Sequence, residues 1–184
     1  MIPAEDRLRA VIGGYQKSFS SKAYCAENED HDVLMDAFGL LTETKRENKQ
    51  YWGRELGMCW QLIVTELFQH SAKGFGRGYR EGADELCDLI ADGDAIDTKY
   101  RIGSGDAGTL KKFKQYGRRL TELGFRPVVL ILREDNLPNA VGACVVGGWT
   151  VLTAAETFAY IEAKTGVDLK AWLVSLGEEF HITR

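Results

Sequence analysis

The segment Cys87–Tyr100, CDLIADGDAIDTKY, constrains the fold more than any other part of this chain. The Asp-Gly dipeptide near its centre favours a two-residue β-hairpin turn, in which both turn residues need a positive φ. Strands paired outward from this turn match residues 91, 90, 89 and 88 with residues 94, 95, 96 and 97. Because strand side chains alternate between faces, Asp88, Asp97 and Lys99 then lie together on one face of the hairpin.

Two carboxylates and one amine on a strand pair indicate a cation site. Like charges that face each other across a strand pair are destabilising, so Asp88 and Asp97 favour a bound divalent ion, Mg²⁺ above all. The same residue types also occur at this spacing by chance in ordinary proteins. The next segment favours the functional interpretation, because residues 99–119 contain seven basic residues and one acidic residue. Cations that hold phosphates beside such a metal site are typical of an enzyme that cleaves phosphodiester bonds.

At this point the residues resemble a known family. Asp88, Asp97 and Lys99 match the PD-(D/E)xK pattern of the restriction-endonuclease-like fold, with Cys87 in place of an opening proline that the family keeps only loosely. The longer run IDTKYRIGSGDAGTLKKFKQYG, continuing to GFRPVVLILREDNLP, resembles type II restriction endonucleases, most of all the ApaLI-type group. The resemblance covers about Gly82 to Trp149.

The resemblance implies an α/β fold with a restriction-endonuclease-like core, a mixed β-sheet flanked by helices, after an N-terminal helical segment. It implies a site-specific double-stranded DNA endonuclease that uses Mg²⁺ and acts as a homodimer, since a palindromic site matches twofold protein symmetry. Two alternatives remain open. One is a structure-selective nuclease of the junction-resolvase kind, and the other is a nucleic-acid-binding or assembly subunit that keeps the fold without cutting.

The family pattern also implies roles for the site residues. Asp88 and Asp97 hold Mg²⁺ through carboxylate oxygens, and the backbone carbonyl of Thr98 is a further ligand. Lys99 positions the attacking water and stabilises charge on the phosphate. In related folds an acid from the preceding helix often joins the site, and Glu55 is the candidate here.

Two other acids are rivals for a place in the site. Glu66 lies on the same expected helix as Glu55, although a solvated helix charge is the stronger interpretation of both residues. Asp84 shares the strand parity of Asp88, but at ~3.3 Å per residue it would lie about 13 Å farther from the turn. Asp88 is therefore the preferred ligand unless a bulge intervenes.

The segments after the hairpin supply the residues expected to contact DNA. Glycines in the loop of residues 101–108 allow close approach to phosphate, unless the loop is a plain turn in which Thr109 caps the next helix. The expected helix places several cations on one side, which suits a DNA backbone or a solvated face. Arg and Asn side chains after the central strand suit base reading, unless they form a polar loop closed by Pro138. We expect DNA contacts from Arg101, Ser104, Lys111, Lys112, Lys114, Arg118, Arg133 and Asn136.

Length and composition predict a single domain of 184 residues, 45% of them hydrophobic and 27% charged. The net charge of −4 argues mildly against a DNA partner, but the basic residues gather in the middle of the chain. The four cysteines lack zinc-site spacing and are typical of thiols in a reducing cytoplasm. With neither a leader nor a membrane-spanning run, we expect a cytoplasmic protein with no membrane and no small-molecule cofactor.

Apolar periodicity predicts helices over residues 5–17, 33–42 and 51–70, joined by polar connections, with a solvated link at residues 46–49. A glycine-rich loop at residues 73–82 leads into the hairpin. A basic helix over residues 109–123, a buried strand over 127–132 and a short strand over 149–152 follow. Two helices, over residues 154–164 and 168–176, end the chain. The expected organisation is N-terminal helices at about 5–70, a nuclease core at about 82–152 and C-terminal helices at about 154–177.

Overall fold

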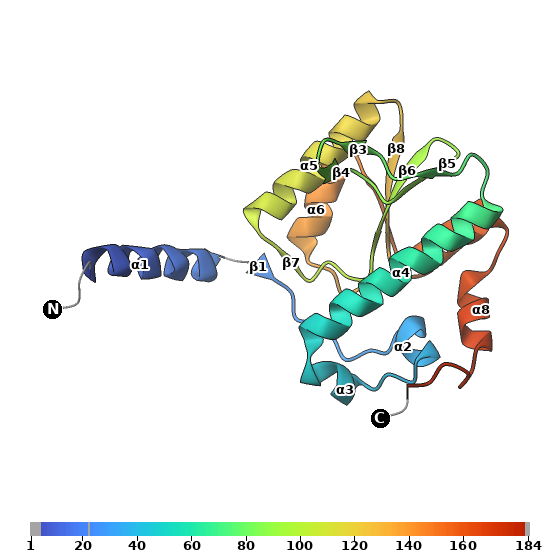
Figure 1. Cartoon of the computed structure of the whole chain (residues 1–184), viewed down its shortest axis with the longest axis horizontal. Coiled ribbons are helices and arrows are strands. Elements are labelled where there is room, and N and C mark those ends of the chain that lie inside the picture. The colour runs from blue at the N-terminus through green and yellow to red at the C-terminus, as the bar shows by residue number, and fades with distance from the viewer. Residues whose placement is uncertain (1–4, 22, 183–184) are drawn as a thin grey trace.

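The computed structural model describes residues 5–21 and 23–182. Their central element is a mixed β-sheet with helices on both faces, and its five strands lie in the order β2-β5-β6-β8-β9 (Figure 1). The strands are β2 (Gly76–Arg77), β5 (Leu89–Ala91), β6 (Asp94–Lys99), β8 (Arg126–Ile131) and β9 (Thr150–Thr153). β5 runs antiparallel to both of its neighbours, β2 and β6, whereas β6, β8 and β9 are parallel to one another.

The β5–β6 hairpin confirms the predicted turn and most of the predicted register. Residues 89, 90 and 91 pair with residues 96, 95 and 94. Asp92 and Gly93 have φ angles of +50° and +78°, as a two-residue hairpin turn requires. The predicted fourth pair, Asp88 with Asp97, is wrong as a ladder pair. The backbone N–H of Asp88 donates instead to the carbonyl oxygen of Ile96 at 2.9 Å, so the strand bends at Asp88.

The parallel part of the sheet is built from two strand-helix-strand crossovers. α5 (Ala107–Glu122) connects β6 to β8, and α6 (Pro138–Val146) connects β8 to β9. Both helices pack on one face of the sheet, against Val129 and Ile131 of β8. The other side chains of β8 face α4 (Lys49–Ser71) across the sheet. Because β8 is buried on both faces from Pro127 onward, its sequence there is continuously apolar rather than alternating.

Three further helices contribute buried side chains to the core between the sheet and α4. They are α2 (Val33–Ala37), α7 (Ala155–Thr165) and α8 (Leu169–Ser175). The pair β1–β7 and the pair β3–β4 lie outside the main sheet. α1 projects away from the rest of the molecule (Figure 1). The remaining elements are α1 (Glu5–Ser21), β1 (Ala23–Tyr24), α3 (Thr42–Glu47), β3 (Arg80–Glu81), β4 (Asp84–Glu85) and β7 (Ser104–Gly105).

Several element boundaries differ from the sequence prediction. The helix expected over residues 33–42 ends at Ala37, because Gly39 adopts a φ of +58° that turns the chain, and α3 begins at Thr42. α6 was not predicted, because its buried side chains are small and its sequence has no clear apolar stripe. The glycine-rich stretch contains two short strands that were not predicted: β2 pairs with β5 of the main sheet, and β3 forms a local hairpin with β4. Within the described residues, no helix combines the length and the apolar character needed to cross a membrane.

Candidate active site

The carboxylate of Asp88 fills the gap left where the hairpin ladder ends. Its Oδ2 accepts hydrogen bonds from the backbone N–H and the hydroxyl of Thr98, at 2.6 and 2.7 Å. Its Oδ1 accepts a hydrogen bond from Nε2 of Gln61 on α4 at 2.7 Å. A carboxylate has about four lone-pair positions, two on each oxygen. Three are occupied here, and the remaining one belongs to Oδ1.

Asp97 and Lys99 lie two residues apart on β6 and therefore on the same face. Nζ of Lys99 is 2.5 Å from Oδ2 of Asp97 and also donates to the carbonyl oxygen of Thr98 at 3.1 Å. The Asp97 side chain is 16% exposed and that of Lys99 is 34% exposed, so both are sheltered without being sealed off. The prediction that Asp88 shares this face is wrong: its carboxylate bonds to the Thr98 side chain, which alternates with those of Asp97 and Lys99, and to Gln61 of α4. Its negative charge still acts on both Asp97 and Lys99.

Burial and the charge of a second carboxylate both affect the pKa of Asp97 in this site. Burial raises the pKa of Asp97 to about 6, the Lys99 ammonium opposes that rise, and the nearby charge of Asp88 adds to it. Burial lowers the pKa of Lys99, but the charges of Asp97 and Asp88 outweigh burial and raise that pKa overall. Lys99 therefore stays charged, and the two carboxylates repel each other, as the sequence predicted for this pair.

The oxygen atoms available here suit a cation that is also bound by waters or by substrate oxygens. Within the part of the chain that the structure describes, Oδ1 of Asp88 accepts from Gln61 alone and Oδ1 of Asp97 has no hydrogen-bond donor. The Thr98 carbonyl accepts one hydrogen bond from Lys99. Among the described residues, no three His, Cys, Asp or Glu side chains gather closely enough to hold a metal ion by themselves. Mg²⁺ usually binds through one or two carboxylates and keeps several waters or substrate oxygens. Two aspartates therefore fit Mg²⁺ better than a metal that needs an all-protein cage.

The structure places the other predicted acids away from this centre. Glu55 is half-exposed and pairs with Arg54 at 2.8 Å, so its predicted place in the site is not supported. Glu66 is exposed, 3.7 Å from His70. Asp84 lies on β4 and pairs with Lys112 at 3.3 Å. Each of these three carboxylates interacts with an exposed neighbour. For Glu55 and Glu66 this agrees with the alternative interpretation, a solvated charge on the helix surface.

Gln61 is the site residue that the sequence interpretation missed. α4 reaches the site through this amide rather than through an acid. The one available signal was a polar residue inside the apolar run Cys59–Val64, where a helix that packs on a sheet is expected to carry apolar side chains.

Three residues predicted to contact DNA are used inside the protein instead. The Arg133 side chain is 4% exposed and forms ion pairs with Asp32 at 2.9 Å and with Asp135 at 2.8 Å. Arg101 pairs with the same Asp135 at 2.9 Å. Oδ1 of Asn136 accepts from the backbone N–H of Ile102 at 2.7 Å. The predictions that Arg133 and Asn136 read bases and that Arg101 contacts phosphate are therefore wrong. These side chains bind groups in the protein's own loops instead.

The cations of α5 divide into two groups. Lys112 and Arg119 pair with acids of the β3–β4 hairpin, Asp84 at 3.3 Å and Glu81 at 2.6 Å. A second group is exposed and has no ion pair within the described part of the chain. It consists of Lys111, Lys114 and Arg118.

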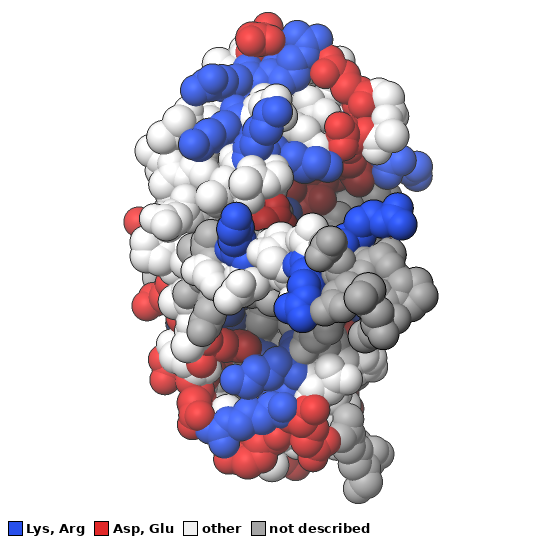
Figure 2. Space-filling model, turned by 90° about the vertical axis from the view of Figure 1, so that its left-hand side faces the viewer, with Lys and Arg blue, Asp and Glu red and all other residues white. Residues whose placement is uncertain are grey.

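The surface around α5 is rich in positive charge. Figure 2 shows Lys and Arg side chains gathered over the upper part of the face that it draws, with acidic side chains both beside them and recessed between them. Ser104, on β7, is also exposed. Thr109 does not cap α5; its backbone N–H donates to the Asp106 carboxylate, which is the cap. Positive charge that no protein acid neutralises is therefore concentrated on α5.

Comparisons of the chain with protein-family models, with curated proteins and with solved structures found no match. Function is therefore inferred from the geometry and charge of the chain itself.

Proposed function

We propose that this protein is a Mg²⁺-dependent, site-specific endonuclease that cuts double-stranded DNA in the manner of type II restriction enzymes with a PD-(D/E)xK site. The observation that carries the proposal is the Asp97–Lys99 ion pair on β6, on which the charge of the Asp88 carboxylate also acts. The mixed sheet, with a parallel β6-α5-β8 unit behind the hairpin, is compatible with a restriction-endonuclease-like core.

The site residues have different chemical roles in this proposal. Asp88 is held in one orientation by Thr98 and Gln61, so its free lone pair has a fixed direction. Lys99 keeps its positive charge and is the donor placed to stabilise negative charge on a phosphate. Asp88 and Asp97 would hold the metal, together with the Thr98 carbonyl. When bound, Mg²⁺ supplies a more acidic water and further charge stabilisation.

The DNA backbone would lie along the exposed cations of α5. A palindromic site implies a twofold pair of subunits, each cutting one strand. Cys25, Cys59, Cys87 and Cys144 are all free thiols, which is compatible with the cytoplasmic location that we propose.

The test is cleavage of a plasmid of known sequence by the purified protein with and without Mg²⁺, followed by mapping of the ends. Discrete fragments are expected. Asp97→Ala and Lys99→Ala should each lower the cleavage rate by about 100-fold or more while DNA binding is largely kept, since the first removes a metal ligand and the second a charge that stabilises the reacting phosphate. Asp36→Ala, which removes an exposed acid of α2, is the matched control and should cut normally.

The outcomes separate the alternatives. Cutting confined to branched DNA would replace site-specific cleavage with structure-selective cleavage. Binding without any cutting would point to a non-catalytic subunit. Full activity in either the Asp97 or the Lys99 variant would remove the catalytic assignment.

A further inference from the structure

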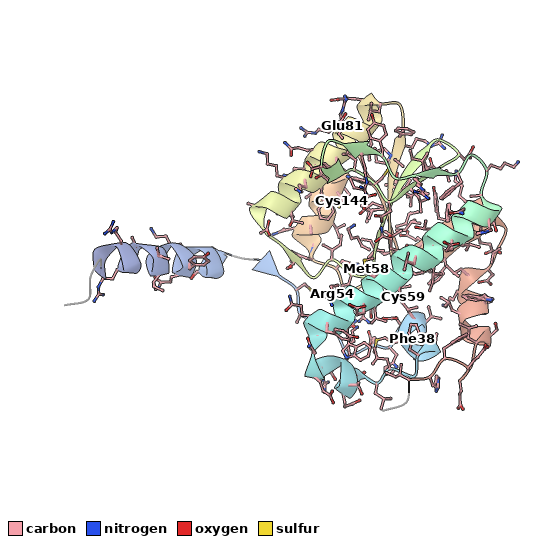
Figure 3. All side chains as sticks on the ribbon, in the orientation of Figure 1. Phe38, Arg54, Met58, Cys59, Glu81 and Cys144 are labelled. Atoms are coloured by element: carbon pink, nitrogen blue, oxygen red, sulfur yellow. The ribbon has the colours of Figure 1, made fainter. Side chains whose placement is uncertain are left out.

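One line of side chains on α4 faces solvent along most of the helix. Arg54, Met58, Leu62 and Glu66 are spaced four residues apart, so they form a single ridge on the helix surface, here called the α4 ridge. Met58 is 50% exposed and Leu62 is 57% exposed. The Arg54 and Glu66 side chains are 70% and 67% exposed. Figure 3 labels Arg54 and Met58 on α4, which lies in front of the sheet in that view.

The α4 ridge has an apolar centre and opposite charges at its two ends. The buried face of the same helix already supplies the core between α4 and the sheet. The exposed Met58 and Leu62 are therefore not part of that core, and with the neighbouring Trp172 they leave apolar surface open to solvent.

An apolar groove lies beside the α4 ridge. It has a volume of about 420 Å³ and is bounded by α4, α8 and the turn before α8. Leu62 and Glu66 line it from α4, and Val167 and Trp172 line it from the other side. Trp172 is itself 49% exposed. The groove is thus a place where an apolar side chain from another molecule would be buried next to Leu62.

We infer that two copies of this chain pair through the α4 ridge, antiparallel about a twofold axis that passes between Met58 and Leu62. In this arrangement Met58 meets Leu62 of the partner subunit, and Leu62 meets Met58 of the partner subunit. Arg54 meets Glu66 of the partner subunit at one end, and the same contact repeats at the other end. Ridges of residues spaced four apart interdigitate when two helices cross at about −50°.

Charge complementarity selects this partner and this orientation. An antiparallel pair creates two Arg–Glu contacts, whereas a parallel pair would place arginine on arginine and glutamate on glutamate. The present neighbours of these side chains, Glu55 for Arg54 and His70 for Glu66, are exposed pairs of the kind that contributes little to stability. Both charges are therefore available to a second subunit.

The apolar centre of the ridge fits the same partner. Met58 of the partner subunit would lie at the groove beside Leu62, and the unbranched, flexible methionine side chain fills irregular apolar spaces well. The ridge carries one positive and one negative end with no charge between them, so it does not resemble a phosphate-binding surface. The pairing is independent of the proposed nuclease function, although it would supply the twofold symmetry that a palindromic site needs.

Charge reversal tests this pairing. We expect the wild-type protein to be a dimer in light scattering and sedimentation velocity experiments. Arg54→Glu and Glu66→Arg should each weaken dimerisation by about tenfold or more, because each variant creates two like-charge contacts across the axis. The double variant should regain the dimer, since it restores both contacts with their signs exchanged. A mixture of the two single variants should form heterodimers.

Matched controls and a second variant keep the result clear. Arg118→Glu reverses an exposed charge on α5 and should leave the dimer intact. Leu62→Glu should separate the subunits, whereas Val145→Glu, at a 59% exposed apolar position of α6, should not. Circular dichroism verifies that each variant is folded.

Three results would overturn the inference. The first is a monomeric wild-type protein, whether its α4 ridge is then exposed to solvent or binds a different protein. The second is a dimer that the single charge reversals leave unchanged. The third is a folded double variant that stays monomeric. Plasmid cleavage is measured separately, so a dimer without cleavage contradicts the proposed function alone. Cleavage by a monomer contradicts the pairing and the proposed twofold arrangement, and leaves the cleavage chemistry in place.

Discussion

The carboxylate of Asp88 accepts hydrogen bonds from two residues that are distant in sequence, Gln61 on α4 and Thr98 on β6. These bonds replace the strand pairing that ends at Leu89. They also restrict the carboxylate to one orientation, with one free lone pair on Oδ1. The helix and the hairpin therefore jointly fix the acid that we expect to bind the cation.

Replacement of Gln61 by leucine should loosen Asp88 without removing it. We expect Gln61→Leu to raise the Mg²⁺ concentration needed for half-maximal cleavage by about tenfold, because residues that orient metal ligands typically contribute that much to affinity. Titration of Mg²⁺ in the plasmid assay measures the effect. Gln69→Leu, at an exposed position on the same helix, is the control. An unchanged Mg²⁺ requirement in the Gln61 variant would contradict the positioning role.

At the scale of the element, α5 shows that charges close together in sequence have different roles. Its helical pattern was predicted from sequence, and the structure confirms a helix over Ala107–Glu122. Lys112 and Arg119 bind the β3–β4 hairpin to the helix. The exposed group of Lys111, Lys114 and Arg118 is left for an external anion.

Replacement of that exposed group by alanine should weaken DNA binding to all sequences alike. Each lost phosphate contact should lower the slope of log affinity against log salt by about 0.9, so the triple variant should lose roughly 3 units if all three residues contact phosphate. Filter binding or fluorescence anisotropy at several salt concentrations measures this. A Lys112→Ala/Arg119→Ala variant is the comparison, and it should change the slope less because protein acids already neutralise those charges. Equal loss of slope per residue in both variants would argue against a phosphate-binding role specific to the exposed group.

At the scale of the whole molecule, Asp94 joins three elements at the end of β6 opposite Lys99. Its side chain is 4% exposed and accepts from Arg126 of β8 at 2.5 Å and from Tyr160 of α7 at 2.6 Å. Lys164 of α7 is 2.7 Å away. Burial raises the pKa of Asp94, but the hydrogen bonds from Arg126, Lys164 and Tyr160 outweigh burial and hold that pKa below its usual range.

This network should make folding stability depend on pH. A carboxyl whose pKa is lowered in the folded state stabilises it above the unfolded-state pKa of about 3.9, and that contribution is lost as pH falls through the folded-state pKa. Asp94→Asn should therefore lower the free energy of unfolding by about 1–3 kcal/mol at pH 7 and by less near pH 3. Denaturant unfolding at both pH values measures the difference. Asp36→Asn, at an exposed acid, should show little change at either pH, and a pH-independent loss in the Asp94 variant would contradict the ionic origin.

The sequence alone determined the features that depend on neighbouring residues. The Asp-Gly turn needs two positive φ angles, the long α4 has an apolar period, and β8 is a continuous apolar run, so each was predicted within a few residues of its observed bounds. The pairing of residues 89–91 with 94–96 followed from the turn itself. These preferences act over a few residues, and no distant part of the chain is needed to satisfy them.

Which polar groups form hydrogen bonds and ion pairs depends on the packing of segments that are distant in sequence. The bend at Asp88 depends on Thr98 and Gln61, and Arg133 is buried because Asp32 and Asp135 are placed around it. α6 likewise forms where the sheet covers its small residues rather than from an apolar stripe. A buried polar group must find a partner, but many segments offer one, and the sequence does not show which of them the packed chain brings within hydrogen-bonding distance.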